Sequence, residues 1–441
     1  MNPPGISGGD TAWVFVASAL VLLMLPGLAL FYGGLVRARA ALNTLMMSFA
    51  AFALVSVQWV LFGYALSFGA GGPIGNLEWL GLSGVGPGPG PYSSTIPHIA
   101  FATFQVMFAG ITVALISGAM VERIRFRAYL LFALLWTTFV YDPIAHWVWA
   151  SDGWLRKLGA LDFAGGTVVH VSAGTAALVA AIMLGRRRDV GRTPLRPHNI
   201  VYTVMGAGPL WVGWLGFNAG SALAADGVAA NALATTHVAA ASGLIAWLAI
   251  DAFRTGHTTA VGGATGAVVG LVAITPAAGY VTPLAAIVIG TAGAAASYAA
   301  IEIRNRTRVD DALDVFACHG VAGIMGALLT GVFATKAVNA AGADGLLAGN
   351  PRLVWVQAVA VLTTMAVAAP MTALILSGIP LLARVRVTLR DELTGVDVSE
   401  HGEHAYHDLD GSAIAGVGTR LGESVFVVSE PEESYPTRGA A

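Results

Sequence analysis

The sequence predicts an all-α integral membrane protein with eleven transmembrane helices. Composition is the first of two observations behind this prediction. Hydrophobic residues make up 56% of the 441 residues, and charged residues make up only 11%. Soluble domains carry about 25% charged residues, so a soluble fold of this length would expose large apolar patches to water.

The second observation is a series of apolar runs of the length that crosses a bilayer. About 20 helical residues span a bilayer core of about 30 Å. We expect spans at residues 11–33, 43–69, 98–121, 128–150, 163–185, 199–222, 232–253, 261–281, 284–302, 313–333 and 352–383. Residues 11–383 therefore form the transmembrane domain, and residues 1–10 are a short extracytoplasmic segment. The first run lacks a positively charged flank, so we interpret it as a true span rather than a signal peptide.

Positive charges predict the orientation of these spans. All but four of the 23 Lys and Arg residues fall in one set of loops or in the C-terminal tail. The four exceptions are Arg156, Lys157, Lys336 and Arg352. Because Lys and Arg collect on the cytoplasmic side, we expect the N-terminus outside and the tail, residues 384–441, in the cytoplasm. Within this tail, residues 411–441 are rich in Gly, Ser, Glu and Pro and are predicted to be disordered.

Other compositional features exclude several functional classes. The single cysteine, Cys318, rules out an intrachain disulfide. A formal net charge of −2 argues against a nucleic-acid partner. The chain has neither an intramembrane His-Glu-x-x-His motif nor a nucleophile elbow, so we expect no enzyme, no metal site and no cofactor.

Two segments repeat within the chain. Asp162 precedes His170 by eight residues, and Asp311 precedes His319 by eight residues. A second pair of similar segments, 27–34 and 213–220, matches spans one and six in the same way. Residues 11–185 and 199–333 are thus predicted to be five-helix repeats, followed by the last helix at 352–383. Because five is odd, the second repeat enters the membrane inverted, which is typical of transporters.

The repeated histidines are candidate functional residues. An ionisable group inside a membrane span is costly and is therefore a functional candidate. At 1.5 Å per residue, His170 and His319 each lie about 12 Å along a helix from the repeat's aspartate, near the middle of the bilayer. One interpretation is a pair of imidazoles that line a narrow pore and offer nitrogens to a small polar permeant. The alternative is two separate structural histidines.

The repeated aspartates and several aromatic residues also have two interpretations each. Asp162 either handles the proton or charge of a permeant or caps the backbone at the start of its span. Asp311 and Asp314 present the same ambiguity at the start of the tenth span. The aromatic residues either form a cation site together with a hydroxyl group or belong to the interfacial belt of the membrane. The residues concerned are Phe108, Trp149, Phe217 and Ser221.

Four motifs closely resemble the ammonium transporter (Amt/Mep/Rh) family over residues from about 10 to 410. They are Asp162-Phe-Ala-Gly-Gly-Thr-Val-Val-His170 with the following Val-Ser-Ala-Gly, Pro26–Arg37, Gly216–Ser221 and Asp314–Gly323. The tail segment His401-Gly-Glu-His-Ala-Tyr406 resembles the prokaryotic Amt branch. The resemblance implies an eleven-helix protomer with no cofactor, a homotrimer with one pore per subunit in the cell membrane, and a PII-type signal protein as partner.

The resemblance also implies roles for individual residues. It assigns ammonium recruitment to Trp149, Ser221 and Phe108, and a stacked phenyl gate to Phe108 and Phe217. Asp162 matches the family's acidic residue, and His170 and His319 match its paired pore histidines. Trp214 and Thr275 match further residues of the pore lining or its mouth.

These roles lead to a transport hypothesis. Bare ammonium would pay a large desolvation penalty in an apolar pore, whereas neutral ammonia avoids most of it. We therefore expect recruitment of ammonium, removal of a proton, and passage of ammonia with the proton following separately, which makes uptake electrogenic. The alternatives are a passive ammonia or carbon dioxide channel of the Rh type, an ammonium sensor, and a transporter of another solute.

Overall fold

The computed structural model describes residues 5–191 and 195–406, and the described residues up to Ala405 belong to one compact, mostly helical unit. Its helices before the fifth predicted span are α1 (Gly8–Leu35), α2 (Ala41–Gln58), α3 (Tyr64–Phe68), α4 (His98–Ile116), α5 (Phe126–Trp136), α6 (Asp142–Trp149) and α7 (Trp154–Leu158). The later helices are α8 (Ser172–Leu184), α9 (Ile200–Gly220), α10 (Gly227–Thr255), α11 (Ala260–Ile274), α12 (Pro283–Asn305), α13 (Ala322–Phe333), α14 (Arg352–Gly378), α15 (Leu389–Thr394) and α16 (Val396–His401).

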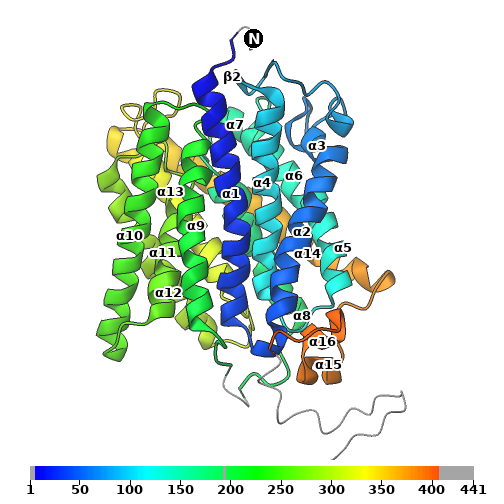
Figure 1. Ribbon diagram of the computed structural model, residues 1–441. Helices are drawn as coiled ribbons and strands as arrows, with labels where there is room; N and C mark the ends of the chain where they lie inside the picture. Colours follow the sequence, from blue (N-terminus) through cyan, green and yellow to red (C-terminus); the bar gives the residue numbers. More distant parts are fainter. Residues whose placement is uncertain (1–4, 192–194, 407–441) are drawn as a thin grey trace, which may run out of the picture. The chain divides into compact units, whose positions relative to one another are not determined.

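Long helices run side by side through the bundle (Figure 1). Ten helices in the described part of the chain are long and apolar enough to cross a membrane. They correspond to ten of the eleven predicted spans. The remaining one, predicted at 261–281, is the shorter helix α11 of 15 residues, which ends before Pro276. Proline disfavours helix in the residue before it, which explains the early end. The count of eleven and the orientation of the termini stay predictions.

Within the described residues, four helical rods contain a π-helical turn, in which the backbone bonds reach one residue further than in an α-helix. These turns are η2 (Trp59–Gly63), η5 (Thr137–Tyr141), η6 (Gly166–Val171) and η7 (Phe316–Val321). Short 3₁₀ turns are η1 (Ala38–Ala40), η3 (Leu80–Leu82), η4 (Ser117–Ala119), η8 (Leu346–Ala348) and η9 (Ile379–Leu381). The long loop before α4 contains a small antiparallel hairpin of β1 (Pro89–Gly90) and β2 (Ser93–Pro97).

Segments that the sequence repeat matches lie in contact. Helices α1 and α9 approach so closely that a Cβ atom on Gly206 would lie 2.4 Å from the backbone nitrogen of Phe31. At the second matched pair, a Cβ on Gly174 would lie 2.2 Å from the backbone nitrogen of Gly320. Small residues allow membrane helices to approach to backbone contact. Glycines therefore hold the two predicted repeats together along their central helices.

The described part of the tail packs on the end of the bundle opposite to the start of α1 (Figure 1). The Asp397 carboxylate accepts hydrogen bonds from the first backbone N–H groups of α2, at 2.8 Å from the nitrogen of Asn43. The Glu400 carboxylate accepts from the nitrogen of Phe126, at the start of α5, at 3.0 Å. Carboxylates are favourable at helix N-termini. Residues 389–401 thus cap two helices, while the prediction of disorder for 411–441 lies outside the described residues.

Candidate functional site

Three cavities lie along the inside of the bundle, and we name each by its residues. The Trp149 vestibule has a volume of about 670 Å³ and is lined by Phe108, Trp149, Asp162 and Ser221, among others. The histidine cavity, of about 20 Å³, is lined by residues that include His170, Trp214, Phe217 and His319. The Asp314 vestibule, of about 500 Å³, is lined by Phe31, Tyr32, Asp314 and His319, among others.

The Trp149 vestibule gathers the aromatic residues that the sequence singled out. The Trp149 indole lies edge-on to the ring of Phe108, with centroids 5.8 Å apart, and its Nε1 donates to the backbone oxygen of Asp162 at 2.9 Å. The Ser221 hydroxyl donates to the backbone oxygen of Phe217 at 2.9 Å. Because that proton is engaged, the hydroxyl oxygen offers its lone pairs as an acceptor. Aromatic faces beside an acceptor can hold a small cation.

Asp162 uses its carboxylate to cap the turn that begins the fifth span. Its two oxygens accept hydrogen bonds from the backbone nitrogens of Gly165, Gly166, Thr167 and Val168, at 2.6–3.1 Å. The Thr167 hydroxyl donates to the same carboxylate. Five donors fill the acceptor positions of one carboxylate, which has about four lone-pair sites. The geometry therefore agrees with the capping interpretation of Asp162, although the residue also lies on the vestibule wall.

Two phenyl rings lie in contact between the Trp149 vestibule and the histidine cavity. The rings of Phe108 and Phe217 lie 4.2 Å apart between centroids, tilted by 36°, and both side chains are buried. The Phe217 ring in turn stacks on the His170 ring at 6.2 Å. Phe108 lines the Trp149 vestibule and Phe217 lines the histidine cavity, so the two rings lie between these spaces.

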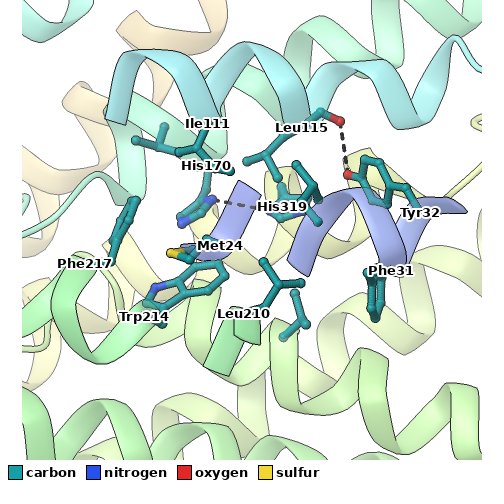
Figure 2. Close-up of a pocket in the computed structure, with 13 residues that line it drawn as sticks. Met24, Phe31, Tyr32, Ile111, Leu115, His170, Leu210, Trp214, Phe217 and His319 are labelled. Atoms are coloured by element: carbon teal, nitrogen blue, oxygen red, sulfur yellow. Dashed lines mark hydrogen bonds between the residues drawn. The ribbon is translucent and has the colours of Figure 1, made fainter. Parts of the chain in front are cut away.

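The two histidines meet beyond these rings (Figure 2). Nδ1 of His170 lies 3.3 Å from Nδ1 of His319, and both rings are buried. Only one of the two nitrogens can carry the proton between them, because a hydrogen bond needs one donor and one acceptor. In the neutral pair, one Nε2 is then an acceptor and the other is an N–H donor. Within the described chain, Nε2 of His170 has no hydrogen-bond partner, so it is open to a small polar molecule.

The local backbone explains how the histidines are brought together. His170 lies in the π turn η6, and His319 lies in the π turn η7. Such turns are rare and often occur at functional sites. The two helices then cross at Gly174 and Gly320, where their backbones touch. The spacing of eight residues from each aspartate placed both histidines at a similar depth and left open whether they form a pair, and no sequence rule indicates the π turns.

The histidine cavity is narrow and mostly apolar. Its lining includes Met24, Leu28, Ile111, Leu115 and Leu210. Figure 2 shows Met24, Ile111, Leu115 and Leu210 around the two rings. A space of about 10–15 Å³ holds one water molecule, so about 20 Å³ accommodates a single molecule of that size. Trp214 stacks on His170 with ring centroids 5.3 Å apart. Thr275 lies behind it, where its hydroxyl accepts from the Trp214 indole at 2.9 Å, rather than in the lining of this cavity.

Phe31 and Tyr32 are two lining residues to which the sequence analysis gave no role. Both line the histidine cavity and the Asp314 vestibule, so they form the boundary between these spaces. The Tyr32 hydroxyl donates to the backbone oxygen of Leu115 at 3.1 Å, which ties α1 to α4. Both residues lie within the repeated segment 27–34, and this repeat is the sequence signal that could have identified them as lining residues.

A bundle of long apolar helices that contains a narrow cavity and two larger ones is typical of a multi-pass membrane protein of the channel and transporter class. The model of the Ammonium Transporter Family matches residues 12–406, and the chain belongs to this family. An ammonium transporter of Bacillus subtilis (strain 168) is 50% identical over 402 residues, covering 91% of this chain and 99% of the relative.

Solved structures agree with this assignment. The crystal structure of Candida albicans Mep2 superposes with a TM-score of 0.83 at 36% identity, covering 92% of each chain. A structure described as a sensor Amt protein superposes with a TM-score of 0.81 at 28% identity and covers 89% of this chain and 98% of its own. The family of ammonium transporters is not one of enzymes.

Proposed function

We propose that this protein recruits ammonium in the Trp149 vestibule and passes ammonia through the histidine cavity. The observation that carries the proposal is the histidine pair itself, which lies inside a cavity of single-molecule size between two larger ones. The relatives named as ammonium transporters support ammonium as the substrate.

Recruitment rests on Trp149, Phe108, Phe217 and Ser221. The aromatic faces attract the cation, and the Ser221 oxygen accepts one of its N–H groups. Asp162 then fixes the negative charge near this site, while its five hydrogen bonds hold the start of the histidine helix in place. We assign it to charge placement and positioning rather than to direct acceptance of the permeant's proton.

Passage depends on a change of species at the two phenyl rings, which form a hydrophobic barrier. A bare cation loses its hydration there and finds few polar partners beyond it, whereas ammonia pays much less. In the cavity, the acceptor Nε2 of one histidine takes a hydrogen bond from ammonia and the donor Nε2 of the other gives one. Trp214 holds the ring of His170 by stacking, and Thr275 holds Trp214. Before the barrier, ammonium gives its proton to a water molecule of the Trp149 vestibule, so that an N–H bond breaks while an O–H bond of hydronium forms. The proton then crosses separately, which makes transport electrogenic.

The assembly and its partners follow from the same family membership. We propose a homotrimer in the cell membrane with its tail in the cytoplasm, and a PII-type signal protein that docks there. His237 on α10 supports the association of copies, because its side chain is exposed on the outer face of a membrane-spanning helix. An ionisable group facing lipid is costly, so a neighbouring subunit is expected to cover it.

A sensor is the second candidate function, favoured by the similarity to a structure described as a sensor Amt protein. The passive Rh-type channel is the other alternative. Ammonium pulses on liposomes containing the purified protein separate the three. A current specific to ammonium over sodium and potassium supports electrogenic transport, whereas internal alkalinisation without current indicates an ammonia channel. The absence of both signals would favour the sensor.

A variant with both histidines replaced by acidic residues, His170→Asp with His319→Glu, tests the two-species scheme. Acidic side chains in the cavity would stabilise a bare cation, so we expect potassium to carry current in this variant. Potassium exclusion equal to that of the wild type would contradict the scheme.

A further inference from the structure

The Trp149 vestibule has a positive charge on its wall. Arg156 lies on the short helix α7, between Trp149 and the turn that Asp162 caps, and its side chain lines the vestibule. It is the only Lys or Arg among the described residues that line this space. A cation beside a site that recruits a cation is unfavourable, because like charges repel. The position of this charge therefore bears directly on recruitment.

A hydrogen bond holds the Arg156 guanidinium next to the recruiting indole. Its Nη1 donates to the backbone oxygen of Trp149 at 2.6 Å. The charge of Arg156 also acts on the hydroxyl groups of Tyr92 and Tyr280, which both line the vestibule. A cation on the face of the Trp149 indole would then lie within about one Debye length, about 10 Å at 0.1 M salt, of the guanidinium.

No carboxylate neutralises this guanidinium within the described part of the chain. None lies within ion-pair distance of Arg156. Two carboxylates line the vestibule. That of Asp162 is occupied by five hydrogen bonds, and that of Asp226 accepts from the nitrogen of Ala229 at the start of α10. The charge of Arg156 therefore faces the vestibule and is screened there mainly by water and salt.

We propose that Arg156 weakens the recruitment of ammonium by charge repulsion and thereby sets the ammonium concentration at which transport is half-maximal. This inference rests on the function proposed above. A purely structural role is the alternative, because an arginine at the C-terminal end of a helix can bond its last carbonyl groups. The two roles make opposite predictions. Loss of repulsion strengthens the binding of a cation, whereas displacement of the Trp149 ring weakens it.

Ammonium-induced currents on liposomes that contain the purified full-length protein distinguish the two roles. Two like unit charges about 8–10 Å apart in water change a binding constant by about 2-fold. Arg156→Gln should therefore lower the half-saturating ammonium concentration by about 2-fold, and Arg156→Glu, a change of two charges, by about 4-fold. Arg156→Lys restores the charge and should bring this concentration back toward the wild-type value.

Ionic strength supplies a readout that a structural role would not move. The currents are measured at about 0.01 M and about 0.3 M N-methylglucamine chloride, between which the Debye length falls from about 30 Å to about 6 Å. Because salt screens the repulsion, the wild-type half-saturating concentration should fall toward that of Arg156→Gln as salt is added. The ratio between Arg156→Gln and the wild type should therefore approach one.

Lys157→Gln is the matched control. Lys157 is the next residue of α7, is also exposed and carries the same charge, but it is not among the lining residues of the vestibule. Its replacement should leave the half-saturating concentration unchanged. An unchanged or higher value in Arg156→Gln and Arg156→Glu, or an equal decrease in Lys157→Gln, would overturn this inference alone. A wild-type protein without any ammonium-specific current would instead remove the proposed function and this inference with it.

Discussion

At the starts of the helices that carry His170 and His319, the matching aspartates Asp162 and Asp311 make different hydrogen bonds. In the first predicted repeat, Asp162 accepts four backbone N–H groups and a hydroxyl. In the second, Oδ2 of Asp311 accepts from the nitrogen of Phe316 at 2.7 Å, and Oδ1 has no hydrogen-bond partner in the described ranges. The Asp162 carboxylate is thus saturated with hydrogen bonds, whereas the Asp311 carboxylate keeps one oxygen without a partner among the described residues. The repeated motif therefore gives the two aspartates matching positions in the chain, while their hydrogen bonds differ.

The largest expected effect is the loss of the saturated cap. Asp162→Ala leaves four N–H groups without their acceptor, and each such loss costs about 1–3 kcal/mol when buried. We expect a destabilisation of at least about 4 kcal/mol, together with loss of transport. Thermal unfolding in detergent micelles measures it. Asp152→Ala is the control, because Asp152 accepts one exposed N–H, from Gly71. Similar melting of both variants would contradict the distinction between the two ends.

The next largest expected effect is that of pH on the ion pairs of Asp310, the residue immediately before Asp311. Burial alone would raise the pKa of Asp310, but the Arg187 guanidinium, at 2.8 Å, and Arg123 lower it to about 2. A lowered pKa means that this stabilisation is present above about pH 4 and disappears as the pH falls toward 2. It amounts to about 2 kcal/mol. The stability difference between the wild type and Asp310→Asn should shrink by this amount from pH 6 to pH 2, and a constant difference would disprove the ion-pair account.

Much of this comparison could be predicted from the sequence. The apolar runs predicted eleven spans, and ten of them correspond to helices long and apolar enough to cross a membrane, because bilayer thickness fixes their length. The spacing from Asp162 to His170, repeated from Asp311 to His319, placed both imidazoles near the middle of the bilayer, where one of the two interpretations paired them. Such predictions succeed where one physical requirement dominates the local pattern.

Other features could not be predicted from composition or spacing. The predicted run 313–333 placed Asp314 inside a span, whereas the helical segment begins at Phe316. Gly165 carried the stronger signal for a left-handed residue, since glycine adopts this conformation freely and aspartate only occasionally. The early end of α11 differs from these two features, because Pro276 within the predicted run 261–281 does indicate it. The run of apolar residues continues past Pro276, so a prediction from apolar character alone extends the span too far.

A substitution at Gly174, where the helices that carry His170 and His319 cross, should have an intermediate effect on stability and transport. A Cβ on Gly174 would meet the backbone of Gly320 at 2.2 Å, so Gly174→Ala forces the helices apart. Overpacking of this kind costs about 1–3 kcal/mol and should separate the histidines, with a transport loss of about 10-fold. Gly208→Ala is the matched control, because nothing lies within 4 Å of a Cβ at that helical glycine. Equal stability and transport in the two variants would show that backbone contact does not position the histidines.

The smallest expected effect is a change in stability on substitution of Gly165 or Asp314, which occupy matching positions of the sequence repeat and both have a left-handed backbone. Asp314→Gly relieves the backbone cost of a left-handed residue but adds the flexibility of glycine to the unfolded chain, so we expect a gain of at most about 1 kcal/mol. Gly165→Ala should lose at least about 1 kcal/mol, because the new Cβ takes on that cost and would meet Cγ2 of Val169 at 2.5 Å. Unfolding is measured at pH 5, where Asp314, with a pKa of about 7, is largely uncharged. Opposite signs for the two variants would separate the backbone contribution of Asp314 from its charge, whereas a loss of stability in Asp314→Gly would mean that contacts of the carboxyl group outweigh the strain.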